Sequence, residues 1–238
     1  MTRPKRTHKK KNRSAGRTPQ LLTAVVANEK GEIFDLEGYA AVGADGAQFN
    51  SLTTANTIEL PHGSELMFLP DRAPVLLDRS TGTLGPLDRN PYAPDEKIFP
   101  VAAFNSPGVV LTHTCAYEEH AQARILPLFS YGAVGWYGEG FRSAAMVVDT
   151  EPRQDLRRMP QDRIVAGVRQ MQKQLPDNRL ARHLEHCALT YGCPAGKNFF
   201  LGRYEAPLPT SQACNARCLG CISLQADAQL TSSQNRIA

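Results

Sequence analysis

The 238-residue sequence lacks any long uninterrupted apolar run, and its first residues lack the apolar segment of a secretory signal. These absences argue against a membrane span and against secretion, so we expect a cytoplasmic protein with no membrane partner. A G-x4-G-K-S/T phosphate loop and a G-x-S-x-G nucleophile motif are also missing, which removes the sequence support for a P-loop nucleotidase or an α/β-hydrolase. Aromatic residues amount to only 7% and are scattered, which argues against a base-stacking platform.

Acidic residues are absent from residues 1–18, which carry eight of the 27 basic residues. Without these eight, 19 basic residues stand against 23 acidic ones, so the rest of the chain carries a net charge of −4 although the whole carries +4. A segment with so few apolar residues cannot bury enough surface to fold, and we expect a disordered, solvated basic tail. Contact with nucleic acid or anionic lipid through counterion release is the alternative.

Short runs of Val, Leu and Phe separated by turn residues dominate residues 19–151. This pattern predicts a β-rich, N-terminal all-β domain, either a sandwich or a barrel. Residues 70–94 are rich in proline and aspartate and are expected to include a long surface loop. The expected strands cover residues 21–27, 32–37, 65–69, 74–77, 99–104, 109–114, 126–131 and 144–149.

Helical periodicity replaces the β pattern after Pro152, which predicts a helical segment over residues 152–192. One helix is expected over residues 160–175, with a core-facing stripe that continues through Met171 and Leu175. A second helix is expected to start after the N-cap residue Asn178 and to stop near Gly192.

The most informative chemistry lies near the C-terminus, where Cys214, Cys218 and Cys221 form the pattern C-x3-C-x2-C. Clustered thiolates are preferred ligands of iron–sulfur clusters and of zinc, and both usually take four ligands. Three local thiols therefore need a distant fourth ligand or leave one metal position open. A zinc site completed by His183 or His186 is an alternative, as are three unliganded thiols. The chain lacks a second C-x2-C or H-x3-H unit, which favours an iron–sulfur cluster.

This loop resembles the cluster-binding loop of the radical SAM (S-adenosylmethionine) enzymes, and so does the asparagine that follows its first cysteine. The stretch from Tyr191-Gly192-Cys193-Pro194 to Pro207-Leu208-Pro209 also resembles bacterial members of that family.

The resemblance implies that Cys214, Cys218 and Cys221 hold three irons of a [4Fe–4S] cluster. It further implies that the amino and carboxylate groups of S-adenosylmethionine chelate the fourth iron. Reduction by an electron donor would then release a 5′-deoxyadenosyl radical, which abstracts hydrogen from a substrate of unknown identity. Gly220 stands where the family often has an aromatic residue near the adenine, so it is the implied cofactor-binding position.

Only 17 residues follow Cys221. The resemblance places the loop after the first strand of a partial (β/α)6 barrel, most of which would come later. We therefore expect an α+β chain with an N-terminal all-β domain, a short helical segment, and only the start of the barrel over residues 193–238. We expect such a chain to be the N-terminal part of a larger protein, a truncated gene product, or half of a split enzyme, and a fragment of this kind could hold the thiols without catalysing a reaction.

Two further sets of potential ligands lie outside the main motif. Cys187 and Cys193 are separated by five residues and are candidates for an auxiliary metal site, although Cys187 is equally explained as a small buried hydrophobe. A denser patch could bind a metal or form a solvated loop; it comprises His113, Cys115, Glu118, Glu119 and His120.

From these motifs we expect a radical SAM-type protein that binds a [4Fe–4S] cluster and S-adenosylmethionine, without a nucleic-acid partner. The alternative is a non-catalytic metal-binding module with a zinc or iron–sulfur knuckle, which contacts nucleic acid through its basic tail. The enzyme would lose S-adenosylmethionine binding on removal of any one of the three cysteines. The module would depend on the tail, and its affinity would fall steeply with salt.

Overall fold

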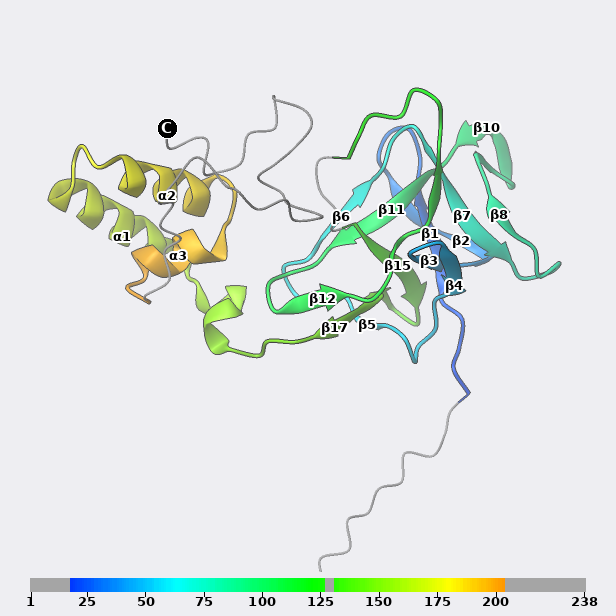
Figure 1. Cartoon of the computed structure of the whole chain (residues 1–238), viewed down its shortest axis with the longest axis horizontal. Coiled ribbons are helices and arrows are strands. Elements are labelled where there is room, and N and C mark those ends of the chain that lie inside the picture. The colour runs from blue at the N-terminus through cyan, green and yellow to red at the C-terminus, as the bar shows by residue number, and fades with distance from the viewer. Residues whose placement is uncertain (1–17, 127–130, 204–238) are drawn as a thin grey trace, which may run out of the picture.

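The computed structural model describes residues 18–126 and 131–203, so the basic tail and the cysteine loop lie outside the described residues. The described chain forms a β-rich unit followed by a helical unit, as Figure 1 shows. The strands are β1 (Thr23–Ala27), β2 (Ile33–Ala40), β3 (Val42–Asp45), β4 (Gln48–Ser51), β5 (Ile58–Glu59), β6 (Glu65–Phe68), β7 (Arg72–Asp78), β8 (Leu84–Pro86), β9 (Arg89–Asn90), β10 (Ala93–Lys97), β11 (Phe99–Phe104), β12 (Val109–Leu111), β13 (Thr114–Cys115), β14 (Tyr117–Glu119), β15 (Gly132–Tyr137), β16 (Gly140–Ser143) and β17 (Ala145–Val147). Two short 3₁₀ turns, η1 (Pro152–Gln154) and η2 (Leu156–Arg158), lead to the helices α1 (Gln161–Gln174), α2 (Arg179–Leu189) and α3 (Pro194–Phe200).

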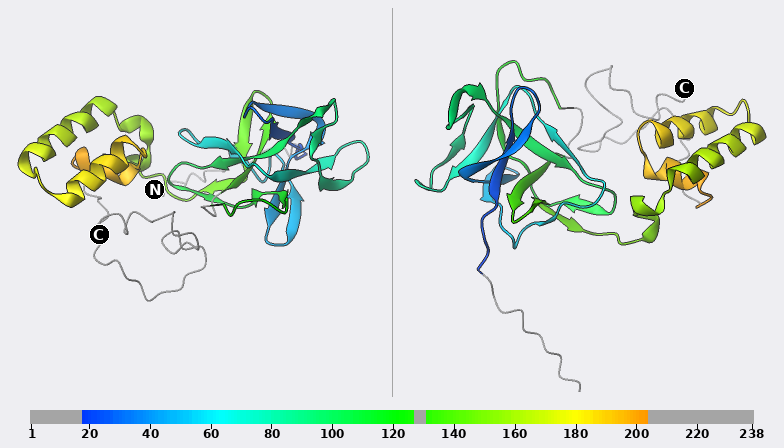
Figure 2. Two further views of the ribbon diagram at one scale, coloured as in Figure 1. Left: turned by 90° about the horizontal axis from the view of Figure 1, so that it is seen from above. Right: turned by 180° about the vertical axis from the view of Figure 1, so that it is seen from behind.

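Strand β1 lies at the centre of the main sheet and is apolar along almost its whole length. It pairs with β2, β11 and β15, and these pairings curl the sheet into a half-barrel (Figure 2). Ala24 and Val26 pack into a cluster with residues from β2 and β7, whereas Val25 and Ala27 pack into a second cluster with residues from β11 and β15. Because successive side chains of a strand point to opposite faces, both faces of β1 are buried.

Strand β7 carries a buried arginine that ties the sheet to the loop beyond β14. Only 2% of the Arg72 side chain is exposed, and its guanidinium donates to Glu119 Oε1 at 2.8 Å. It also donates to the carbonyl oxygens of Pro70 at 3.0 Å and Arg124 at 2.6 Å, and it lies 5.2 Å from the ring centroid of Tyr117. The planar fork of the guanidinium allows one side chain to serve these partners together.

The helical unit has its own apolar core, to which all three helices contribute. The predicted N-cap of α2 is confirmed, because the side chain of Asn178 accepts a hydrogen bond from the backbone N–H of Ala181 at 2.9 Å. The predicted stripe of α1 is correct at Ile164 and Val168, which are buried, but wrong at Leu175. Leu175 is 45% exposed because α1 ends at the preceding residue.

Several sequence-based expectations for the β-rich unit need correction. Residues 70–94 do not form a long loop, since they contribute to β7, β8, β9 and β10. The strand expected over residues 126–131 falls largely outside the described residues, and β15 begins at Gly132. The hairpin of β3 and β4 was not expected.

The expected barrel is also at odds with the structure. A (β/α) barrel requires parallel strands joined by crossover helices. Every strand pair in the described ranges is antiparallel, and the three helices follow one another after the last strand. Helix α3 occupies residues at which the barrel was expected to begin, and it packs on α1 and α2. The expectation is therefore wrong for residues 193–203, and the rest of the expected barrel lies outside the described residues.

The packing of α1 on α3 predicts a position that cannot accept a side chain. A Cβ atom at Gly167 would overlap the carbonyl oxygen of Phe200, which is backbone and cannot rotate away. We expect Gly167→Ala to lower the free energy of unfolding by about 1–3 kcal/mol, as overpacking does, although alanine favours helix. Urea unfolding followed by circular dichroism at 222 nm measures this. Gly85→Ala is the control, because a Cβ there meets nothing within 4 Å; equal destabilisation by both would contradict the close contact.

The buried guanidinium gives a second prediction. Arg72→Lys retains the charge but loses the fork, so we expect the free energy of unfolding to fall by at least about 2 kcal/mol, the scale of one or two charged hydrogen bonds. The same urea titration measures it. Arg89→Lys serves as the matched control, because Arg89 is exposed and donates only to the carbonyl oxygens of Pro94 and Asp95. An unchanged midpoint for Arg72→Lys would show that the fork contributes little.

Candidate functional site

The residues of the predicted cluster site, Cys214, Cys218 and Cys221, lie outside the described residues, and so does Gly220. Their roles stay predictions. The chain leaves the described part at Arg203, which is fixed to the segment before α1. Its backbone N–H donates to Asn198 O at 2.9 Å, and its guanidinium donates to Arg158 O at 2.8 Å. Only ten residues separate this anchored residue from the first cysteine of the motif.

The candidate auxiliary pair comes close together at the backbone. The N–H of Cys193 donates to the carbonyl oxygen of Cys187 at 2.9 Å. Cys187 is buried on α2, and its Sγ lies 3.4 Å from His183 Nε2, whereas Cys193 is the half-buried N-cap residue of α3. Neither forms a disulfide. Across residues 18–126 and 131–203 no group of three potential ligands is close enough to hold a metal, so an auxiliary metal site stays a prediction.

The residues of the 113–120 patch have separate partners. The Cys115 thiol donates to Val101 O in the core, and burial raises the pKa of this thiol to about 12. Glu119 pairs with Arg72, and His120 Nε2 lies 2.8 Å from Asp88 Oδ1. Cys115, Glu119 and His120 are thus each held in a structural contact of their own.

The structure instead reveals a cavity of about 920 Å³ at the junction of the two units. Three segments that are distant in the sequence line it, namely residues 63–65, 104–111 and 191–197, together with Leu156. Its walls are mixed: Phe104, Val110 and Leu111 are apolar, whereas the polar lining includes Ser64, Asn105, Ser106, Lys197 and the acidic Glu65. We call this the junction cavity. Its volume is in the range of small-molecule sites, roughly 300–1,000 Å³.

Two local features hold the junction cavity open. Gly63 has a φ of +80°, which favours glycine, and the Leu156 side chain lies where a Cβ of residue 63 would stand. Leu156 also packs against the core of the helical unit, so one side chain contacts both units. Next to Gly63, the backbone N–H of Ser106 donates to Ser64 Oγ at 3.1 Å and joins the rims of β6 and β11.

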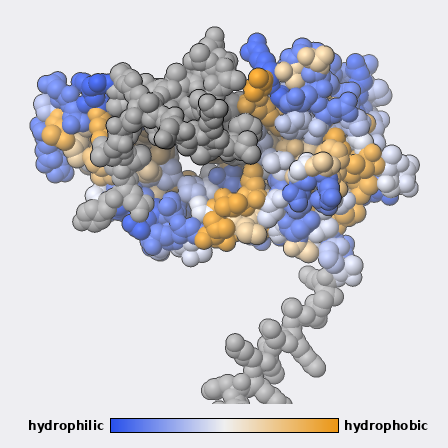
Figure 3. All heavy atoms as spheres, viewed as in Figure 1, coloured by the Kyte–Doolittle hydropathy of each residue, from blue (hydrophilic) through white to orange (hydrophobic). Residues whose placement is uncertain are grey.

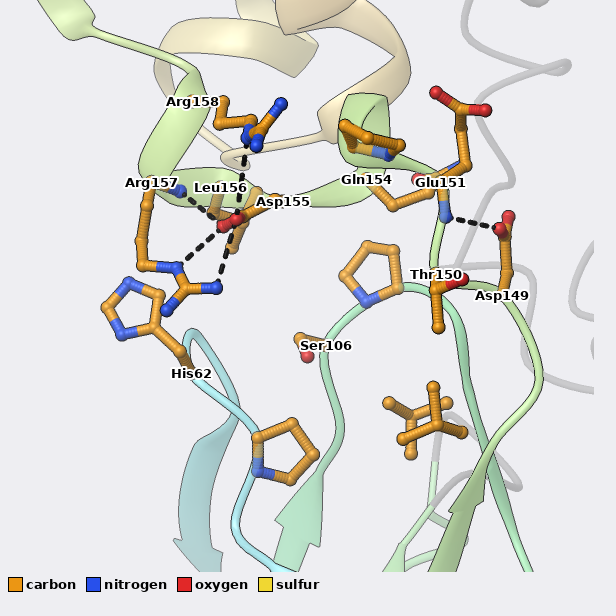
Figure 4. Close-up of a pocket in the computed structure, with 15 residues that line it drawn as sticks. His62, Ser106, Asp149, Thr150, Glu151, Gln154, Asp155, Leu156, Arg157 and Arg158 are labelled. Atoms are coloured by element: carbon orange, nitrogen blue, oxygen red, sulfur yellow. Dashed lines mark hydrogen bonds and ion pairs between the residues drawn. The ribbon is translucent and has the colours of Figure 1, made fainter. Parts of the chain in front are cut away.

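A smaller polar pocket of about 320 Å³ adjoins the junction cavity and shares Ser106 and Leu156 with it (Figure 4). Its carboxylate Asp155 accepts from Arg157 Nε at 2.8 Å and from Arg157 Nη2 at 3.0 Å. The hydrogen bond from the Arg157 side chain lowers the pKa of Asp155. An ionised carboxylate held in this way is a poor general acid or base near neutral pH, so this pocket stabilises the segment between the units.

The junction cavity could not be found from sequence patterns. The His62-Gly63 and Ser106-Pro107-Gly108 turns are visible as turn signals, and the stretch Tyr191-Gly192-Cys193-Pro194 stood out as part of the family resemblance. That these three segments meet is decided by the docking of the helical unit.

The longest helix among the described residues, α1, has 14 residues, and no helix there is long and apolar enough to cross a bilayer.

Burial, together with the raised pKa of the Cys115 thiol, predicts the order in which the thiols of the described part react. In native protein treated with iodoacetamide we expect Cys193 to be alkylated first, Cys187 more slowly, and Cys115 only on unfolding. Site-resolved mass spectrometry at increasing times measures this order. Alkylation of Cys115 as fast as that of Cys193 in native protein would contradict the buried position, and protein in urea, where all three should react alike, is the control.

Neither a protein-family model, nor a curated protein, nor a solved structure matches this chain. The function is therefore argued from the residues of the chain and the geometry of its described part.

Proposed function

We propose that this chain is a radical SAM-type protein, which binds a [4Fe–4S] cluster through Cys214, Cys218 and Cys221 and S-adenosylmethionine at the iron that these thiols leave open. The observation that carries the proposal is the C-x3-C-x2-C spacing, three thiols within eight residues. When bound, the cluster and S-adenosylmethionine supply radical chemistry, and the protein supplies ligation and a site that excludes water.

The donor set supports a cluster with one open position. Thiolates are the usual ligands of iron–sulfur clusters, and this loop supplies three of the four that a closed site needs. The thiols of the described part are poor substitutes for the missing ligand. Cys115 is protonated in the β core, and Cys187 is buried against His183. Cys193 alone among these three is partly accessible.

The described part would contribute support for the loop. The bonds from Arg203 to Arg158 and Asn198 anchor the chain shortly before the motif, and Asn198 is itself held by a bond from its Nδ2 to Arg153 O at 3.1 Å. A ligand loop that starts from a fixed residue loses less conformational entropy on binding a cluster than one that starts from a free chain.

The first experiment is electron paramagnetic resonance on anaerobically reconstituted, dithionite-reduced protein, with and without S-adenosylmethionine. We expect a [4Fe–4S]⁺ signal that changes when S-adenosylmethionine is added, because the cofactor would bind the open iron. Replacing all three loop cysteines by alanine should abolish the signal and reduce the bound iron to background. Cys115→Ala is the matched control, since it removes a thiol that the core keeps protonated.

Two outcomes would count against the proposal. A cluster signal that does not change when S-adenosylmethionine is added would indicate an iron–sulfur protein that does not bind this cofactor. Bound zinc without iron would favour the metal-binding module. In the second case the affinity for nucleic acid should fall steeply with salt and should disappear when residues 1–18 are removed. The double variant Cys187→Ala/Cys193→Ala tests the auxiliary site, because an iron content equal to that of the parent would rule it out.

A further inference from the structure

The junction cavity contains one basic and one acidic side chain that have no partner among the residues that the structure describes. Lys197 comes from α3 and Glu65 from β6, and both line the cavity. Within the described ranges, neither side chain forms a hydrogen bond or an ion pair, either with the other or with a third residue. Unpaired charges of opposite sign on two walls of one cavity are suited to a ligand that carries both charges.

The rest of the cavity lining indicates what kind of ligand body fits between Glu65 and Lys197. Phe104 and Val110 are 37% and 51% exposed, and Leu111 continues the same apolar wall. Figure 3 shows that apolar surface continues over the ribbon of β12 and β17, where Met146 and Val147 are about half exposed. A ligand that fits this wall therefore has an apolar body.

A hydrogen-bonding group of the cavity is suited to the amide backbone of a peptide ligand. Ser64 Oγ accepts from the N–H of Ser106, so its own hydroxyl hydrogen remains available to a carbonyl oxygen. Asn105 Nδ2 donates to Ser143 Oγ at 3.0 Å, and its Oδ1 is buried, so this side chain is fixed in the wall of the cavity. The cavity of about 920 Å³ is at the upper end of the small-ligand range, which favours a chain of a few residues over a single amino acid.

We propose that the junction cavity binds a short apolar peptide with free ends, whose terminal ammonium pairs with Glu65 and whose terminal carboxylate pairs with Lys197. The inference rests on described residues alone and does not depend on the proposed cluster. Cys193 lies on the same wall as Lys197, one helical turn earlier, so a bound peptide would cover its thiol.

The test uses the tripeptide Leu-Gly-Leu, its N-acetylated form and its C-terminal amide, with binding measured by isothermal titration calorimetry on the cluster-free full chain. We expect the free peptide to bind and each blocked form to bind about tenfold more weakly, because each has lost one charge-assisted hydrogen bond. Bound Leu-Gly-Leu should also slow the alkylation of Cys193 and leave that of Cys187 unchanged.

Two variants assign the ends of the peptide. Glu65→Gln should weaken the binding of the free peptide and of the C-terminal amide about tenfold and leave the binding of the acetylated form unchanged. Lys197→Met should weaken the binding of the free and acetylated peptides and leave the binding of the amide unchanged. Glu139→Gln and Lys173→Met, at exposed positions outside the cavity, are the matched controls. Circular dichroism confirms that every variant is folded.

Other outcomes would overturn the inference. Undetectable binding of Leu-Gly-Leu, or an equal loss of affinity in all four variants, would show that the cavity is not a peptide site. Tighter binding of free leucine than of the tripeptide would assign the site to single amino acids. S-adenosylmethionine, which also carries an ammonium and a carboxylate, is included as a competitor, and displacement of the peptide in a variant without the three loop cysteines would assign the cavity to that molecule instead.

Discussion

The contact of Leu156 with Gly63 is the interaction on which the arrangement of the two units depends. Leu156 occupies the space that a side chain at residue 63 would fill, and it also joins the core of the helical unit. One side chain therefore links a turn of the β-rich unit to the apolar interior of the helices. In the described part of the chain, the segment with the two 3₁₀ turns connects β17 to α1, and its Leu156 fixes this segment against the β-rich unit at one wall of the junction cavity.

Each unit is stabilised by a different kind of constraint. The β-rich unit is built around β1, whose two faces are buried in separate clusters, and around the buried guanidinium of Arg72, which donates to the carbonyl oxygens of Pro70 and Arg124. The helical unit depends on the close approach of backbones at Gly167, where no side chain fits between α1 and the end of α3. Both constraints specify geometry more than they add apolar area, since a carbonyl oxygen or a guanidinium tolerates little displacement.

The proposed cluster site and the junction cavity are complementary features of one chain. The three cysteines of the C-x3-C-x2-C loop follow an anchored residue, Arg203, whereas the cavity lies where α3 meets the rims of β6 and β11. A radical reaction requires a substrate held in a defined position close to the cofactor. The cavity, with its two opposite charges and its apolar wall, is argued from described residues alone, whereas the cluster site is argued from the thiol spacing, so the two proposals can be tested separately.

Local chemistry determined much of this protein from the sequence by itself. The β-rich and helical regions, the cap at Asn178, and the thiol spacing all follow from patterns within a few residues of one another. Residues 74–77 were expected to form a strand and lie within β7, whereas β8, β9 and β10 were missed because the proline and aspartate content of this stretch is that of a loop. Only the tertiary structure decided that Cys115 is protonated in the core, that Leu156 covers Gly63, and that Glu65 and Lys197 line one cavity. Burial and proximity depend on how distant segments pack, and no local pattern encodes that packing.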